Sequence, residues 1–160
     1  MAFYLDSEGE TTCSSSADEK TIIGDANPDF EYGFTKNLSY RGFCLSVFLQ
    51  GSQGNDIFNA TRIETEGMTD SKNQSRAVLD RWREPGDITD IPRTSEGNTD
   101  NSRLSTRFVE DGSYLRMKAL TLSYSLPQNF LETISLDAVK LYATGENLFT
   151  ITDYSGFDPE

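Results

Sequence analysis

Hydrophobic and polar side chains alternate in two pairs of segments along the chain. In residues 30–40, apolar side chains occupy one parity, broken only by Lys36, and polar or small residues occupy the other. After the two residues at 41–42, the same alternation resumes over residues 43–50. A period of two is typical of a β-strand with one apolar and one polar face. The pattern therefore predicts an antiparallel hairpin at residues 28–50.

A second hairpin is predicted over residues 113–151. One face of its first strand collects four large side chains, Leu120, Leu122, Tyr124 and Leu126. Counted by the same parity, Arg116 and Lys118 fall on this apolar face, so we expect the apolar band to cover only the second half of the strand. Pro127 then ends the strand, and the alternation returns over residues 136–150.

Long polar segments surround the hairpins. Residues 51–112 separate them and residues 1–27 precede the first; both are rich in acidic, Gly, Ser, Thr and Asn residues. Only residues 73–82 have a pattern compatible with a short helix. A connection this long with so little structure is unusual in a compact domain. Short turns at one end of the strands and a long loop at the other are typical of outer-membrane barrels, where Arg116 and Lys118 would lie above the membrane.

The composition excludes several classes of function. The 160 residues carry a formal net charge of −12, which disfavours nucleic acid and anionic membrane surfaces as partners. The chain has no His, which removes His-based acid–base catalysis and His metal ligands. Two cysteines, Cys13 and Cys44, cannot form a disulfide scaffold. We find neither a signal peptide at the N-terminus nor an apolar run long enough for a transmembrane helix.

Three groups of residues are candidate sites. A calcium loop at Asp6, Glu8 and Glu10 matches the spacing of oxygen ligands poorly, so an ordinary solvated loop is favoured. Paired carboxylates, which a glycosidase needs, are frequent in so acidic a chain, as at Glu64/Glu66 and Glu110/Asp111. Trp82, between two arginines, is a candidate for stacking on a sugar, against the favoured alternative of packing under the loop. We therefore assign no catalytic, cofactor-binding or metal-binding residue, and expect no cofactor and no enzyme activity.

Four motifs, in the same order, resemble those of SusC/RagA-type TonB-dependent transporters. Residues 23–34, IGDANPDFEYGF, resemble "IGNPNPDFxYGF", and residues 48–59, FLQGSQGNDIFN, resemble "FxQGSxGNDIYN". Residues 108–127, FVEDGSYLRMKALTLSYSLP, are similar to "FVEDGSYLRLKNLTLGYxLP". Residues 146–160, ENLFTITDYSGFDPE, are similar to "QNLFTxTxYSGxDPE". The resemblance covers nearly all the chain from about residue 21 and is weakest over residues 1–20.

The resemblance implies an all-β fold of antiparallel strands within a large barrel of the 22-strand type. The chain would be a fragment from near the C-terminal end of that barrel, and the plug and closing strand would lie outside it. In this arrangement the segments are a loop at 1–27, a hairpin at 28–50, a long extracellular loop at 51–112, a hairpin at 113–151 and the start of the next loop at 152–160.

The function implied by the resemblance is energised uptake of oligosaccharides or peptides across the outer membrane of a Gram-negative, Bacteroidetes-type bacterium. The implied partners are outer-membrane lipid, the rest of the barrel and plug, TonB, a SusD-like surface lipoprotein and the glycan or peptide ligand. The alternative from a different class is a soluble β-sandwich module that binds carbohydrate. In a barrel, Phe43, Leu45, Val47 and Leu49 would face lipid, whereas in a sandwich they would face a second sheet.

Overall fold

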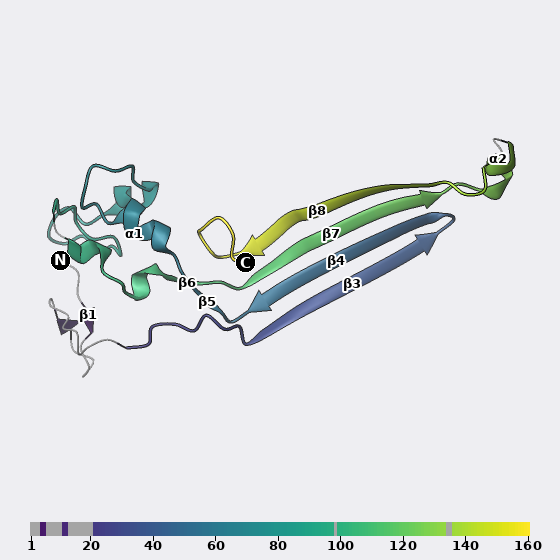
Figure 1. Ribbon diagram of the computed structural model, residues 1–160. Helices are drawn as coiled ribbons and strands as arrows, with labels where there is room; N and C mark the ends of the chain where they lie inside the picture. Colours follow the sequence, from purple (N-terminus) through teal and green to yellow (C-terminus); the bar gives the residue numbers. More distant parts are fainter. Residues whose placement is uncertain (1–3, 6–10, 13–20, 98, 134–135) are drawn as a thin grey trace. The chain divides into compact units, whose positions relative to one another are not determined.

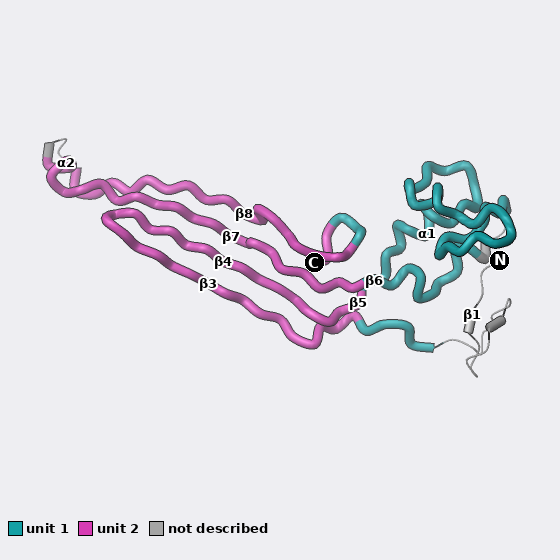
Figure 2. Tube along the Cα trace, turned by 180° about the vertical axis from the view of Figure 1, so that it is seen from behind, with its two compact units in different colours: residues 1–25, 57–110, 155–157 teal, residues 26–56, 111–154, 158–160 magenta. Residues whose placement is uncertain are grey.

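The protein is described by a computed structural model, which defines residues 4–5, 11–12, 21–97, 99–133 and 136–160. The calcium-loop hypothesis at Asp6, Glu8 and Glu10 lies outside these residues. The chain divides into two compact units (Figure 2). Unit 1 comprises residues 1–25, 57–110 and 155–157, and unit 2 comprises residues 26–56, 111–154 and 158–160.

Unit 2 is built on one antiparallel sheet of four long strands (Figure 1). The strands are β3 (Phe30–Tyr40), β4 (Phe43–Gln53), β7 (Tyr114–Ser125) and β8 (Lys140–Thr152). Their order in the sheet is β3-β4-β7-β8, so the two hairpins lie side by side. The prediction of an all-β chain with two antiparallel hairpins is confirmed.

The two hairpins are closed in different ways. Arg41 and Gly42 form a two-residue turn with φ values of 46° and 88°, as a type I′ turn requires. The helix α2 (Gln128–Thr133) lies between β7 and β8, after Pro127 has ended the strand. Among the described segments, no helix is long and apolar enough to cross a membrane.

A β-bulge in β7 determines which face its upstream residues occupy. Phe48 pairs with Ala119 but Leu49 pairs with Met117, so Lys118 is an extra residue in β7. An extra residue reverses the parity of everything upstream of it. The expectation that Arg116 lies on the apolar face is therefore wrong: Arg116 lies on the polar face.

The neighbouring strand β8 is irregular at the same level. Met117 pairs with Phe149 and Ala119 pairs with Glu146, which leaves two residues of β8 opposite Lys118. One of them, Asn147, has a positive φ of 50°, which Asn tolerates better than most residues.

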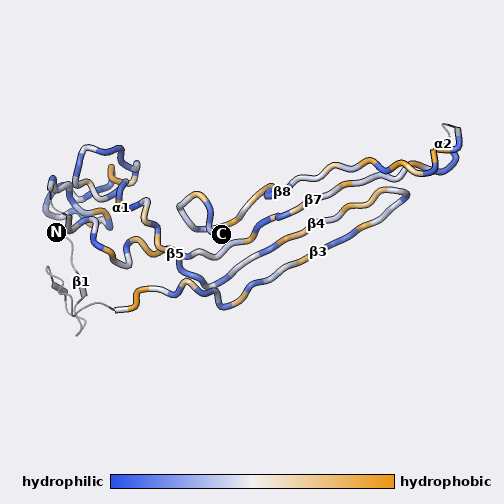
Figure 3. The backbone as a smooth tube through the Cα atoms, in the orientation of Figure 1, coloured by the Kyte–Doolittle hydropathy of each residue, from blue (hydrophilic) through white to orange (hydrophobic). Residues whose placement is uncertain are grey.

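The register gives the sheet one continuous apolar face. Its members are Phe30, Tyr32, Phe34, Leu38, Tyr40, Phe43, Leu45, Val47, Leu49, Leu115, Met117, Leu120, Leu122, Tyr124, Leu141, Ala143, Phe149 and Ile151, with Lys36 as the charged exception. Many of these side chains are exposed, for example Phe34 at 55% and Ile151 at 62%. Hydropathy alternates along the strands in Figure 3. Because of the bulge, the apolar band covers β7 along its whole length rather than its second half alone.

The long excursion between the hairpins contains several short elements, mostly in unit 1. They are β5 (Asp56–Phe58), α1 (Ala60–Glu66), η2 (Arg76–Asp80), η3 (Thr99–Ser102), η4 (Thr106–Phe108) and β6 (Val109–Asp111), while β1 (Tyr4–Leu5) and β2 (Thr11–Thr12) pair near the N-terminus. β5 and β6 form a two-stranded sheet. Unit 1 buries Met68, Val78 and Phe108. The helix expected at residues 73–82 is reduced to the 3₁₀ turn η2.

Candidate functional site on the polar face of the sheet

The polar face of the sheet is lined mainly by hydroxyl and amide groups. Its members include Thr35, Asn37, Ser39, Ser46, Gln50, Thr121, Ser123 and Thr144. Two of them meet across β7 and β8, where the Oγ1 atoms of Thr121 and Thr144 are 3.0 Å apart. Such groups donate and accept hydrogen bonds without charge, which suits contact with water, sugar hydroxyls or peptide groups.

Charge gathers on this face at the end remote from the Arg41–Gly42 turn. Arg116 Nη1 lies 2.8 Å from Glu160 Oε2, and Arg116 Nη2 bonds to Asp158. Arg116 Nε donates to Thr150 Oγ1 at 2.9 Å, and Lys118 Nζ donates to Glu160 Oε1 at 2.7 Å. We call these five residues the Arg116 cluster.

The bulge is the reason that the Arg116 cluster exists. Without the extra residue at Lys118, Arg116 would share a face with Leu120 and Leu122. With it, the guanidinium group lies 5.5 Å from the ring centroid of Tyr114, a neighbour on the polar side of the sheet. The Arg116 side chain is only 7% exposed. Parity counting missed this cluster, because it kept one phase along the whole strand, whereas the apolar residues change phase at the bulge, from Leu115 and Met117 to Leu120 and Leu122.

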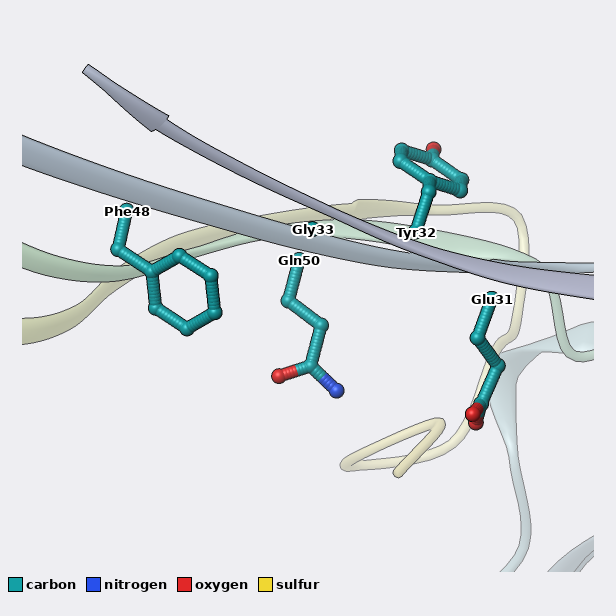
Figure 4. Close-up of a pocket in the computed structure, with 5 residues that line it drawn as sticks. All are labelled: Glu31, Tyr32, Gly33, Phe48 and Gln50. Carbon is teal, nitrogen blue, oxygen red and sulfur yellow. The ribbon is translucent and has the colours of Figure 1, made fainter.

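A shallow depression lies on the hairpin β3–β4. It is lined by Glu31, Tyr32, Gly33, Phe48 and Gln50, with a volume of about 260 Å³. Figure 4 shows Glu31, Phe48 and Gln50 on one side of the sheet and the Tyr32 ring on the other. The Phe48 ring packs over Gly33, where a Cβ atom would lie 3.3 Å from it. The depression thus offers a ring face beside one amide and one carboxylate.

In unit 1, Glu110 is held by four hydrogen bonds. Its oxygens accept from Asn59 Nδ2 at 3.1 Å, Arg62 Nη1 at 2.9 Å, and Ser155 N and Oγ at 2.8 and 2.9 Å. Burial opposes ionisation of this carboxyl, but the bonds from Ser155, Arg62 and Asn59 outweigh it and lower its pKa. A glycosidase acid needs a raised pKa, so Glu110 is not suited to that role.

The other carboxylate pair of the sequence is divided between two environments. Glu66 is buried and accepts from Arg62 Nε and Nη2 at 3.0 and 3.1 Å, and Arg107 Nη2 lies 3.3 Å from Glu66 Oε2. Glu64 is exposed and pairs with Lys72. The two carboxylates therefore do not share one cleft. Among the described residues, no cluster of His, Cys, Asp and Glu could hold a metal ion.

Trp82, the candidate for sugar stacking, is half-buried in unit 1. Its backbone N–H donates to the carbonyl of Ile91 at 2.9 Å. Phe58, another aromatic residue of unit 1, makes an edge-to-face contact with Phe108 at a centroid distance of 6.4 Å. A ligand role for Trp82 stays a prediction. Cys44 is a free thiol on the polar face, and Cys13 lies outside the described residues.

Comparison with known proteins relates the chain to one group of receptors. TonB-dependent receptor P3 of Formosa agariphila is 41% identical over 156 residues, which make up 98% of this chain and 15% of the receptor. TonB-dependent receptor SusC of Bacteroides thetaiotaomicron is 27% identical over 164 residues, again 98% of this chain and 15% of the receptor. No family model matches the chain.

Solved structures relate the chain to transporters of the same kind. The chain superposes on the RagAB peptide transporter with a TM-score of 0.86 and 28% identity, covering 98% of this chain and 18% of the transporter chain. The RagAB peptide importer in its open-open state matches with a TM-score of 0.84 at the same identity.

These relatives are receptors and transporters rather than enzymes, and the chain spans only about 15% of the length of the curated ones. Within the described part of unit 2, no second sheet faces the apolar side chains, as the β-sandwich alternative would require. Sequence, motifs and fold agree: the chain belongs to the SusC/RagA-type TonB-dependent receptors and corresponds to a four-stranded segment of their β-barrel.

Proposed function

We propose that this chain is a wall segment of an outer-membrane transporter for the energised uptake of oligosaccharides or peptides. The observation that carries the proposal is the continuous apolar face on four adjacent strands, opposite a face of neutral hydrogen-bonding groups. A barrel wall needs this division, because one side meets lipid and the other meets solute and water.

The dimensions of the strands support this role. They contain 11, 11, 12 and 13 residues, and a tilted strand of about 9–11 residues crosses a bilayer. Aromatic residues gather near the turn end of the apolar face, where Phe43 and Tyr124 stack with ring centroids 4.4 Å apart. Rings at this level match the aromatic girdle of a barrel at the membrane interface.

The partners follow from the surfaces that the sheet leaves open. The apolar face would contact outer-membrane lipid, and the outer edges of β3 and β8 would pair with the rest of the barrel, because unpaired strand edges do not occur in lipid. TonB and the plug would act through parts of the receptor outside this chain. A SusD-like lipoprotein would assist at the cell surface of a Bacteroidetes-type bacterium, where residues 51–112 would form an extracellular loop.

Two solute classes are compatible with the polar face. The RagAB relative is a peptide importer, which supports peptides. The hydroxyl and amide lining of the sheet, and the Phe48 ring in the depression, suit oligosaccharides equally well. The face would guide solute and not react with it, and its cations Arg116 and Lys118 are engaged in ion pairs with Asp158 and Glu160.

Matched lysine substitutions in the full-length receptor test this proposal. Leu45 and Ser46 are neighbours in β4 that point to opposite faces. A lysine facing lipid costs about 2–4 kcal/mol at mid-membrane, so Leu45→Lys should reduce the amount of folded barrel in the outer membrane. Ser46→Lys should leave it near the wild-type amount. Equal amounts for both variants, or a wild-type protein found in the aqueous fraction, would contradict the proposed lipid-facing side.

A further inference from the structure

Arg116 is buried, but the carboxylates that cover it are not. Its side chain is 7% exposed, whereas those of Asp158 and Glu160 are 55% and 36% exposed. Both carboxylates come from the segment of residues 158–160, which follows the end of β8. A cation fixed on the sheet is thus covered by anions that remain in contact with water.

Both carboxylates of the segment 158–160 point toward Arg116. The backbone N–H of Glu160 donates to Asp158 Oδ1 at 3.0 Å, which closes a tight turn around Pro159. Pro159 itself is buried. Among the described residues of unit 2, the side-chain bonds from this segment to the sheet all end on Arg116 and Lys118. The strands of the sheet are held by their own backbone pairing, so release of the segment leaves the sheet itself intact.

The cations belong to the four-stranded sheet of unit 2. Arg116 lies in β7 between Gln50 of β4 and Thr150 of β8, and its Nε is fixed by the bond to Thr150. Lys118 is the bulge residue of the same strand. Both cations converge on the Glu160 carboxylate, at 2.8 Å from Arg116 and 2.7 Å from Lys118.

A guanidinium fork beside an ammonium group is a receptor for oxyanions, because its several N–H donors match the paired oxygens of a carboxylate or sulfate. In this structure the oxygens of Asp158 and Glu160 fill that position. We propose that Arg116 and Lys118 form a binding site for a carboxylate or sulfate group of the solute, and that the segment 158–160 masks this site until such a group displaces it. The proposal rests on the proposed function only in that the polar face meets the solute.

The masking predicts that oxyanions expose Pro159. In the full-length receptor, with other cysteines replaced by serine, Pro159→Cys reports lifting of the segment through its rate of maleimide labelling. Phe157→Cys is the matched control, since Phe157 is fully exposed already. Sodium sulfate or acetate should increase the labelling rate of Pro159→Cys several-fold over sodium chloride at equal ionic strength, and should not change that of Phe157→Cys. Equal rates in all three salts would overturn the proposal.

A second measurement avoids the substitution of Pro159. The double variant Asp158→Asn/Glu160→Gln removes the masking charges and keeps the shape of the segment. Because the tethered carboxylates compete at a high effective concentration, the double variant should bind sulfate about tenfold or more tighter than the wild type in a calorimetric titration. Adding Arg116→Met to the double variant should abolish this gain in sulfate affinity. Wild-type affinity in the double variant would overturn the proposal.

Comparison of acetate with sulfate also indicates which kind of solute supplies the oxyanion. A stronger response to acetate indicates a carboxylated solute, such as a peptide or an acidic sugar, and a stronger response to sulfate indicates a sulfated one. Neither measurement depends on transport. A receptor that assembles in the outer membrane and takes up solute, but shows no oxyanion response, therefore contradicts this inference alone and not the proposed function.

Discussion

The ring of Tyr32 lies directly over Gly51 on the apolar face of the sheet. A Cβ atom at residue 51 would come within 2.3 Å of Tyr32 Cζ and 2.8 Å of the backbone oxygen of Tyr114. On the polar face the relation is reversed, and the Phe48 ring lies over Gly33. The two sequence motifs of the first hairpin therefore interlock, since each supplies an aromatic ring that covers the glycine of the other.

Alanine at these two glycines should have unequal effects. Gly51→Ala would force both the Tyr32 ring and the backbone of β7 to move, and overpacking of this kind costs about 1–3 kcal/mol. Gly33→Ala meets only the Phe48 ring, at 3.3 Å, and should cost less. Thermal unfolding of the purified full-length barrel measures both. A larger loss for Gly33→Ala would show that the Tyr32–Gly51 contact is looser than described.

The hairpins could be predicted from the sequence because alternation survives in each strand. The bulge at Lys118 was not predicted, although the apolar alternation changes phase there, because one parity was counted along the whole strand; pairing with β4 and β8 shows the extra residue. The predicted face of Arg116 was wrong for that single reason. Alternation is intact on each side of the bulge but changes phase across it, and only the pairing with the partner strands shows that an extra residue causes this change.

The elements of unit 1 were harder to predict for a different reason. The helix α1 is stabilised by ion pairs rather than by an apolar stripe. Arg62 forms one ion pair with Glu66 within the helix and another with Glu110 in β6. In residues 73–82 the apolar pattern was present, but Ser75 caps only a short turn and Leu79 is left 59% exposed. Hydrophobic periodicity is a weak guide where packing depends on long-range ion pairs.

Deletion of Lys118 should be far more damaging than its substitution. Removing the bulge residue would return Leu115 and Met117 to the polar face and place Arg116 on the apolar face, facing lipid. Lys118→Ala keeps the register and loses only the bond to Glu160. We expect little folded barrel from the deletion and a near wild-type amount from Lys118→Ala, measured by heat-modifiable mobility. Normal assembly of the deletion variant would mean that the bulge does not set the register.

Lys36 is the charged residue on the apolar face, paired with Val47 across the first hairpin. If this face meets lipid, the lysine lowers the stability of the barrel by about 2–4 kcal/mol at mid-membrane and by less near an interface. Lys36→Met should therefore raise the unfolding temperature of the full-length receptor, and Lys140→Met on the polar face should not. A loss of stability with Lys36→Met would show that Lys36 has an acidic partner on a neighbouring strand.

The Glu110 network should make unit 1 sensitive to acid. The folded-state pKa of Glu110 is lowered, so its contribution to stability is complete above its ordinary value of 4.5 and is lost as the pH falls through the lowered value. The protection of amides around Asn59 and Ser155 against hydrogen exchange, relative to their intrinsic exchange rate at each pH, should fall below about pH 4.5 in the wild type. Glu110→Gln should already exchange faster at pH 7 and respond less to acid. The exposed carboxylate variant Glu84→Gln is the control, and identical pH profiles for all three proteins would contradict the prediction.

The role of Trp82 can be separated from its packing by measuring uptake and surface display together. Trp82→Ala in the full-length transporter should reduce uptake at unchanged surface display if the indole ring stacks on the apolar face of a sugar. Leu79→Ala is the matched control, because Leu79 lies in the same segment and is more exposed. Lost display with Trp82→Ala would mean that the ring supports the fold of unit 1, in keeping with its half-buried position. Unchanged uptake and display would end the case for Trp82 as a ligand-contacting residue, and recognition would then rest on the polar face of the sheet and its Arg116 cluster.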